Sequence, residues 1–147
     1  MASIFKLFTT DRQCKIAVVQ YERADYGVGT EEHLHWAIWA LFDRDISLLK
    51  TRKCLGGVYI GSVKYSQIKA LREVASGNGP VPKFPEWNCR DWVIEVIQLF
   101  AEQGWISTSI PDQATLLPSM RIASVATKAA YTGRSLHPIP VIVDLTV

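Results

Sequence analysis

The feature of this chain that most constrains its fold is a change in hydrophobic periodicity between its two halves. In the first half, β-branched and aromatic residues cluster or alternate with polar ones, which predicts strands near residues 14–23, 33–43 and 56–63. Further on, apolar residues recur every three or four positions, which predicts helices near residues 66–76, 89–103 and 119–131, before a last strand near 139–147. We therefore predict an α+β fold in which an antiparallel sheet packs against helices.

The composition indicates one compact domain that spans residues 1–147. Hydrophobic residues make up 48% of the chain, which is enough for a substantial core. The 16 basic and 14 acidic residues nearly balance, and the sequence has no block of like charge that would follow a phosphate backbone. We therefore expect no nucleic-acid partner, and the oligomeric state stays open.

The start of the chain and its cysteines favour a cytoplasmic protein. The opening MASIFKLFTTDRQCK has only a short apolar stretch broken by Lys6, and no window is long enough for a membrane span. Cys14, Cys54 and Cys89 are odd in number and widely spaced, which suits neither a disulfide framework nor a CxxC metal site. We expect no cofactor, and each cysteine could simply fill the core.

Residues 89–103 form the best-defined element, with an apolar stripe on one face and polar residues on the others. Asn88 is a favoured N-cap residue, and Asp91 follows three positions later, as in a capping box. This arrangement puts Cys89 in the first helical turn, where unpaired backbone N–H groups favour a thiolate. Cys89 is therefore either a reactive nucleophile or a core residue.

The strand near residues 33–43 carries two histidines on one face. Alternation along a strand puts His33 and His35 on the same side of the sheet. Either histidine could be a half-exposed strand residue or the partner of a cysteine. A metal site needs further ligands, and the remaining histidine, His137, stands alone beside Pro138, so we expect no metal.

The stretches HWAIW and NCRDWV resemble the signature pair of the lecithin:retinol acyltransferase-like group within the NlpC/P60 papain-like superfamily. In that group a histidine followed by an aromatic residue lies on an early strand, and an asparagine–cysteine pair begins a later helix. The resemblance implies a circularly permuted papain-like fold, with His35 as the general base and Cys89 as the nucleophile. His33 is the fallback base if the strand register differs.

The chain is also similar, over more of its length, to a set of small fungal proteins of unassigned function that carry a His-Trp strand and an Asn-Cys-x-Asp-Trp helix start. The acyltransferase-like enzymes use a third polar residue, commonly a histidine, on the next strand. Here that strand reads GGVYIGSV and offers only Tyr59 and Ser62. Tyr59, Asp43 or a backbone carbonyl could therefore hold the imidazole.

A pair of Cys89 and His35 implies a cysteine-dependent hydrolase or acyltransferase that forms a thioester with a small acyl, ester or amide substrate. Backbone N–H groups of the first helical turn are the expected oxyanion donors. The alternative is a papain-like scaffold that binds a small molecule or a protein, or that catalyses a non-hydrolytic rearrangement. The residues expected to line the substrate pocket, of which the tryptophans could equally belong to the core, are Trp36, Trp39, Tyr59, Trp87, Asn88 and Trp92.

Overall fold

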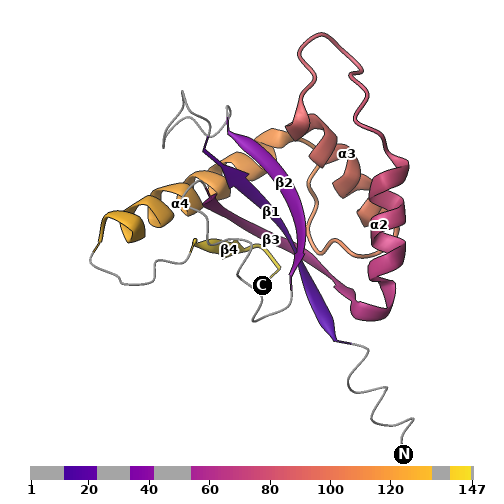
Figure 1. Ribbon diagram of the computed structural model, residues 1–147, viewed down its shortest axis with the longest axis horizontal. Helices are drawn as coiled ribbons and strands as arrows, with labels where there is room; N and C mark the ends of the chain where they lie inside the picture. Colours follow the sequence, from indigo (N-terminus) through magenta and orange to yellow (C-terminus); the bar gives the residue numbers. More distant parts are fainter. Residues whose placement is uncertain (1–11, 23–33, 42–53, 134–139, 147) are drawn as a thin grey trace, which may run out of the picture.

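The computed structural model describes residues 12–22, 34–41, 54–133 and 140–146, and its centre is a four-stranded sheet (Figure 1). The strands are β1 (Gln13–Tyr21), β2 (His35–Leu41), β3 (Cys54–Lys64) and β4 (Ile142–Asp144). Their order across the sheet is β2-β1-β3-β4, so β2 and β4 are the edges of the described sheet. Together with the helices this arrangement confirms the predicted α+β class.

Three helices lie between β3 and β4 in the described part of the chain. A 3-10 turn, η3 (Tyr65–Gln67), leads into α2 (Ile68–Gly77), and α3 (Cys89–Glu102) and α4 (Gln113–Thr132) follow. The helices predicted near residues 66–76 and 89–103 are confirmed. Among the described residues, no helix is both long enough and apolar enough to cross a membrane.

Helix α4 is longer than the sequence suggested. It was expected near residues 119–131, but it begins at Gln113, because the Asp112 side chain caps it by accepting from the backbone N–H of Thr115 at 3.0 Å. Pro118 lies inside the helix, although a proline at an internal position usually breaks or kinks one. Buried side chains on both sides of this proline hold the turn against the core, so packing overrides the local signal.

The sheet is mixed, whereas the sequence predicted an antiparallel one. Strand β1 pairs antiparallel with both β2 and β3, but β4 pairs parallel with β3. A parallel neighbour needs a crossover connection, and the helices supply it between β3 and β4. Strand β4 is also shorter than the predicted range 139–147, whose first and last residues lie outside the described part.

Side chains along β2 alternate between the two faces of the sheet. Trp36 is buried in the main core, together with apolar residues of α2, α3 and α4. Trp39 and Leu41 belong to a smaller cluster on the opposite face, which also contains buried residues of β1 and β3. The predicted alternation is therefore confirmed over the described residues of this strand, and the helices all pack on one face.

Gly56 allows β3 to approach α4 and the segment before β4 closely. Its φ is +81°, and an added Cβ would lie 2.3 Å from the carbonyl oxygen of Val141 and 2.7 Å from Thr127 Oγ1. The same Thr127 oxygen accepts from the backbone N–H of Val141 at 2.8 Å. Three elements therefore meet at a position where only glycine fits.

Gly56→Ala is expected to lower the free energy of unfolding by about 2 kcal/mol or more, because the methyl group overlaps backbone and the residue must keep a positive φ. Urea denaturation measures the loss. The control is Gly77→Ala, since nothing lies within 4 Å of a Cβ added there. That control should gain about 0.4–1 kcal/mol. Equal stability of the two variants would contradict the close packing at Gly56.

Candidate active site

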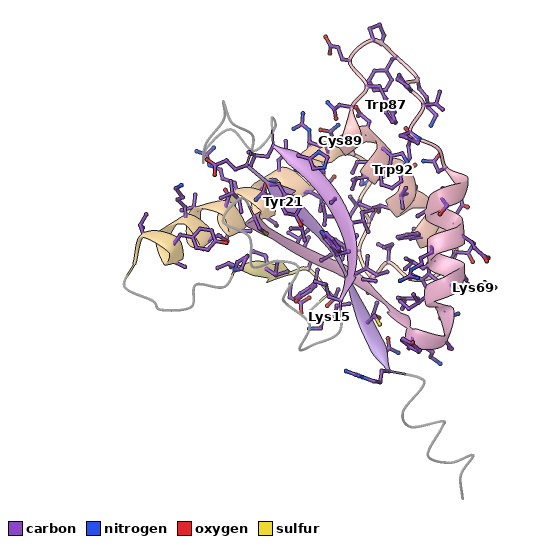
Figure 2. All side chains as sticks on the ribbon, in the orientation of Figure 1. Lys15, Tyr21, Lys69, Trp87, Cys89 and Trp92 are labelled. Carbon is purple, nitrogen blue, oxygen red and sulfur yellow. The ribbon has the colours of Figure 1, made fainter. Side chains whose placement is uncertain are left out.

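The side chains of Cys89 and His35 meet at the N-terminal end of α3, where Cys89 is labelled in Figure 2. The Cys89 Sγ lies 3.1 Å from His35 Nδ1, although the two residues are 54 positions apart in the sequence. Cys89 is half-buried and His35 is exposed, so the contact is accessible from outside. The contact expected from the sequence is present, and the imidazole is within reach of the thiol proton.

A capping box fixes the first turn of α3 and with it the position of Cys89. Asn88 Oδ1 accepts from the backbone N–H of Arg90 at 2.9 Å, and the backbone N–H of Asn88 donates to Asp91 Oδ2 at 2.9 Å. The other carboxylate oxygen of Asp91 accepts from Gln113 Nε2 at 2.7 Å, which ties the start of α3 to the start of α4. The predicted cap is confirmed, and Cys89 is the first residue of the helix.

His35 is the first residue of β2, next to the last residue of β1. Its Cα pairs with that of Tyr21, and the two ring centroids are 6.4 Å apart with planes tilted by 45°. The Tyr21 hydroxyl accepts from Trp39 Nε1 at 3.0 Å, which holds the phenol in place. Burial raises the pKa of Tyr21, and the nearby Cys54 raises it further, so the phenol stays neutral. Tyr21, which the sequence did not single out, therefore restricts the imidazole on one side.

Glu95 anchors the segment that leads into α3. Its carboxylate accepts from Trp87 Nε1 at 2.7 Å and from Asn78 Nδ2 at 3.1 Å, and it forms an ion pair with Lys83. Burial opposes the charge of Glu95, but the hydrogen bonds from these three partners outweigh burial and lower the pKa of the carboxyl group. The chain just before Cys89 is therefore fixed to the same helix that presents the thiol.

Tyr59 lies away from the pair, so the structure corrects its expected role beside the imidazole. It pairs with Ala17, which in turn pairs with Trp39, four residues along β2 from His35. Four strand residues span about 13 Å. The Tyr59 ring instead has the Lys15 ammonium 4.8 Å from its centroid. Another group must therefore orient His35.

Three further residues that were expected in the pocket make contacts that stabilise the fold. Trp36 is only 1% exposed, and the Arg90 guanidinium lies 5.8 Å from its ring centroid. Trp87 is bound to Glu95, and Asn88 caps α3. These side chains position the chain around the candidate site, and the structure does not place them in a common pocket.

A groove lies between α2, α3 and the strands β1 and β2. Its volume is about 890 Å³, and its lining includes the other two predicted pocket residues, Trp39 and Trp92. The indole N–H of Trp92 donates to the carbonyl of Asn78 at 2.7 Å, which fixes the ring. Trp92 follows Cys89 by three residues, about one helical turn, so the groove begins beside the pair without including it.

His33, Asp43 and His137 lie outside the described residues. Within the part that the structure describes, no group of three or more His, Cys, Asp or Glu side chains is arranged to hold a metal ion. The contact between Cys89 and His35 is therefore the chemical feature of the described residues on which a function can be based.

Comparison with known proteins identifies no relative, because no family model, curated protein or solved structure matches the chain. The relationship to permuted papain-like enzymes therefore remains a prediction.

Glu95→Gln is expected to destabilise the protein by about 1 kcal/mol at pH 7, because the ion pair with Lys83 is lost and the amide cannot accept from every present donor. A carboxyl group whose pKa is lowered by folding stabilises the protein above its unfolded pKa. That stabilisation is lost as the pH falls through the lower folded value.

Urea denaturation of wild type and Glu95→Gln between pH 7 and pH 3 should therefore show two stabilities that converge in acid. Glu102→Gln, at the exposed end of α3, is the control and should match the wild type throughout. A stability difference for Glu95→Gln that does not change with pH would contradict the assigned role of the carboxylate.

Proposed function

We propose that this protein is a cysteine-dependent hydrolase or acyltransferase in which Cys89 is the nucleophile and His35 the general base. The observation that carries the proposal is the 3.1 Å separation of Cys89 Sγ and His35 Nδ1. A buried cysteine would be expected to serve packing alone, as suits Cys14 and Cys54, which are 1% and 0% exposed. Cys89 is accessible and has a histidine partner, which is the usual requirement for thiol catalysis.

The proposed reaction begins when His35 Nδ1 takes the proton of the Cys89 thiol. The sulfur then attacks the acyl carbon of an ester, amide or thioester, and the acyl carbon forms a bond to sulfur. As the bond between the acyl carbon and the leaving group breaks, the imidazolium gives its proton to the leaving group. Water or another acceptor then gives a proton to His35 and attacks the thioester carbon. As the carbon–sulfur bond breaks, the acyl product leaves and the imidazolium returns the proton to the Cys89 sulfur.

The oxyanion of each tetrahedral intermediate needs a hydrogen-bond donor close to the sulfur. In the first turn of α3, the Asn88 side chain already accepts from the backbone N–H groups of Arg90 and Asp91. None of the described residues accepts from the backbone N–H of Cys89. We therefore assign the oxyanion contact to that N–H rather than to several groups of the turn.

The way in which α3 packs on β2 supports the proposal of a permuted papain-like site. The helix that begins with the cysteine packs on β2, the early strand that begins with the histidine. In this order along the chain the histidine precedes the cysteine, as the resemblance to the acyltransferase-like group implies. Tyr59 lies too far along the sheet from His35 to hold the far side of its imidazole.

Cys89→Ser and His35→Ala are each expected to reduce turnover of an activated acyl ester by at least about a hundredfold, because the first removes the thiolate and the second its base. Cys54→Ser is the control, since that cysteine is fully buried and an ester in solution cannot reach its sulfur. Circular dichroism should show that all three variants fold. Undiminished turnover in both Cys89→Ser and His35→Ala would refute the proposed function and favour non-covalent ligand binding.

Asn88→Ala tests whether the cap presents the thiol. Loss of the cap should cost about 1 kcal/mol, and the melting temperature should fall by about 3 °C. The alkylation rate of Cys89 by iodoacetamide should fall as well, because the first turn of α3 loosens. Asn88→Ser keeps a side-chain acceptor at the N-cap and should restore both properties. A lower melting temperature with an unchanged alkylation rate would contradict the link between cap and thiol.

A further inference from the structure

The groove beside the Cys89–His35 contact has the volume and the lining of a site for an apolar chain. Its volume is about 890 Å³. The partly exposed apolar side chains of its lining come from β2 and the two helices and include Ile38, Ala40, Ile68, Ala75 and Trp92, and buried core residues lie beneath them. Burial of an apolar ligand against such a surface is favourable in proportion to the area removed from water.

The charged side chains that line this groove are both basic. Lys69 and Arg72 come from α2, and the described lining contains no aspartate or glutamate. Both side chains are exposed, so they lie at the rim with their polar ends in water. The groove therefore combines an apolar floor with a positively charged rim, which suits an amphipathic anion rather than a neutral or cationic chain.

The Lys69 and Arg72 side chains lie toward the end of α2 that is farther from the Cys89 thiol. The residue after α2, Asn78, binds the Trp92 indole one helical turn from Cys89, so the C-terminal end of α2 is the end nearest the thiol. Lys69 precedes Asn78 by nine residues, which corresponds to about 13 Å along the helix axis. Figure 2 shows Lys69 at the end of α2 that is remote from Cys89.

We propose that the groove selects acyl substrates whose chain carries an anionic group at the end remote from the reacting carbonyl. This inference rests on the proposed function, because it takes Cys89 as the point of attack. The carbonyl carbon lies at Cys89, the apolar chain passes Trp92 and follows the groove, and the terminal anion is bound by Lys69 and Arg72. A neutral chain of equal length fills the same groove but leaves both cations without a ligand.

The length of the chain follows from the geometry. The path along the helix axes from Cys89 past Trp92 to Lys69 is about 18 Å, and the long basic side chains span part of it. An extended chain advances about 3.3–3.6 Å for every three bonds. The preferred substrate therefore has roughly ten to fifteen bonds between the carbonyl carbon and the anion, as in monoesters of dodecanedioic acid.

Binding can be measured apart from catalysis with the monomethyl ester of dodecanedioic acid and the Cys89→Ser protein. Isothermal titration calorimetry should give a dissociation constant that rises about fivefold for Lys69→Gln or Arg72→Gln, and more than tenfold for both together, since exposed ion pairs contribute modestly. High salt should weaken binding to the parent protein more than to the double variant. Lys128→Gln, on an exposed part of α4 outside the groove, is the control and should change nothing.

Turnover supplies the second measurement. The wild type should prefer the mono-4-nitrophenyl ester of dodecanedioic acid over 4-nitrophenyl dodecanoate, and the Lys69→Gln/Arg72→Gln variant should lose that preference through KM while it keeps activity on 4-nitrophenyl acetate. Charge-dependent binding without turnover of any ester supports the groove and overturns the proposed function. Turnover of the acetate ester, with equal affinity for charged and neutral long chains, overturns the groove assignment and leaves the proposed function standing.

Discussion

The capping of α3 is the interaction on which the candidate site depends. The Asn88 side chain accepts from the backbone N–H groups of Arg90 and Asp91, and the Asp91 carboxylate accepts from the backbone N–H of Asn88, so the helix begins at Cys89. The hydrogen bond from Gln113 to Asp91 extends this restraint to α4, which packs on β3. The sulfur is therefore held by the same contacts that join two helices of the core, and a loss of the cap affects both stability and chemistry.

The parts of the fold that the sequence predicts are those set by local rules. Asn88, Cys89 and Asp91 lie within one turn, so the cap and the place of the thiol follow from residue type and spacing. The alternation along β2 follows likewise from the period of a strand. The contact of His35 with Cys89 is non-local. It was expected because two short motifs resemble the signature pair of the acyltransferase-like group, and periodicity alone does not predict it.

What the sequence could not predict depends on contacts between distant segments. The start of α4 at Gln113 needs the packing around Pro118, and the parallel pairing of β4 needs the crossover made by the helices. The register of β3 against β1 keeps Tyr59 away from the imidazole, and the register of β1 against β2 brings Tyr21 beside it. Register is set by tertiary packing and turns, so no pattern within a single strand reveals it.

Three tryptophans near the candidate site have three different structural roles. Trp36 fills the core, Trp87 binds Glu95, and Trp92 lines the groove while its N–H is satisfied by Asn78. From the sequence alone, each of these tryptophans could equally line a substrate pocket or belong to the core. The contacts of each indole distinguish them: Trp87 donates to the Glu95 carboxylate and fixes the segment before α3, whereas Trp92 donates to a backbone carbonyl and lines the groove.

The most direct test of the account is whether Cys89 carries an acyl group during reaction. The protein is mixed briefly with 4-nitrophenyl acetate, quenched in acid and digested, and the acetyl group is located by peptide mass spectrometry. The account predicts an acetyl thioester on Cys89 that neutral hydroxylamine removes and that forms far more slowly in His35→Ala. Acetylation of lysines without a thioester on Cys89, or equal acylation rates in wild type and His35→Ala, would contradict it.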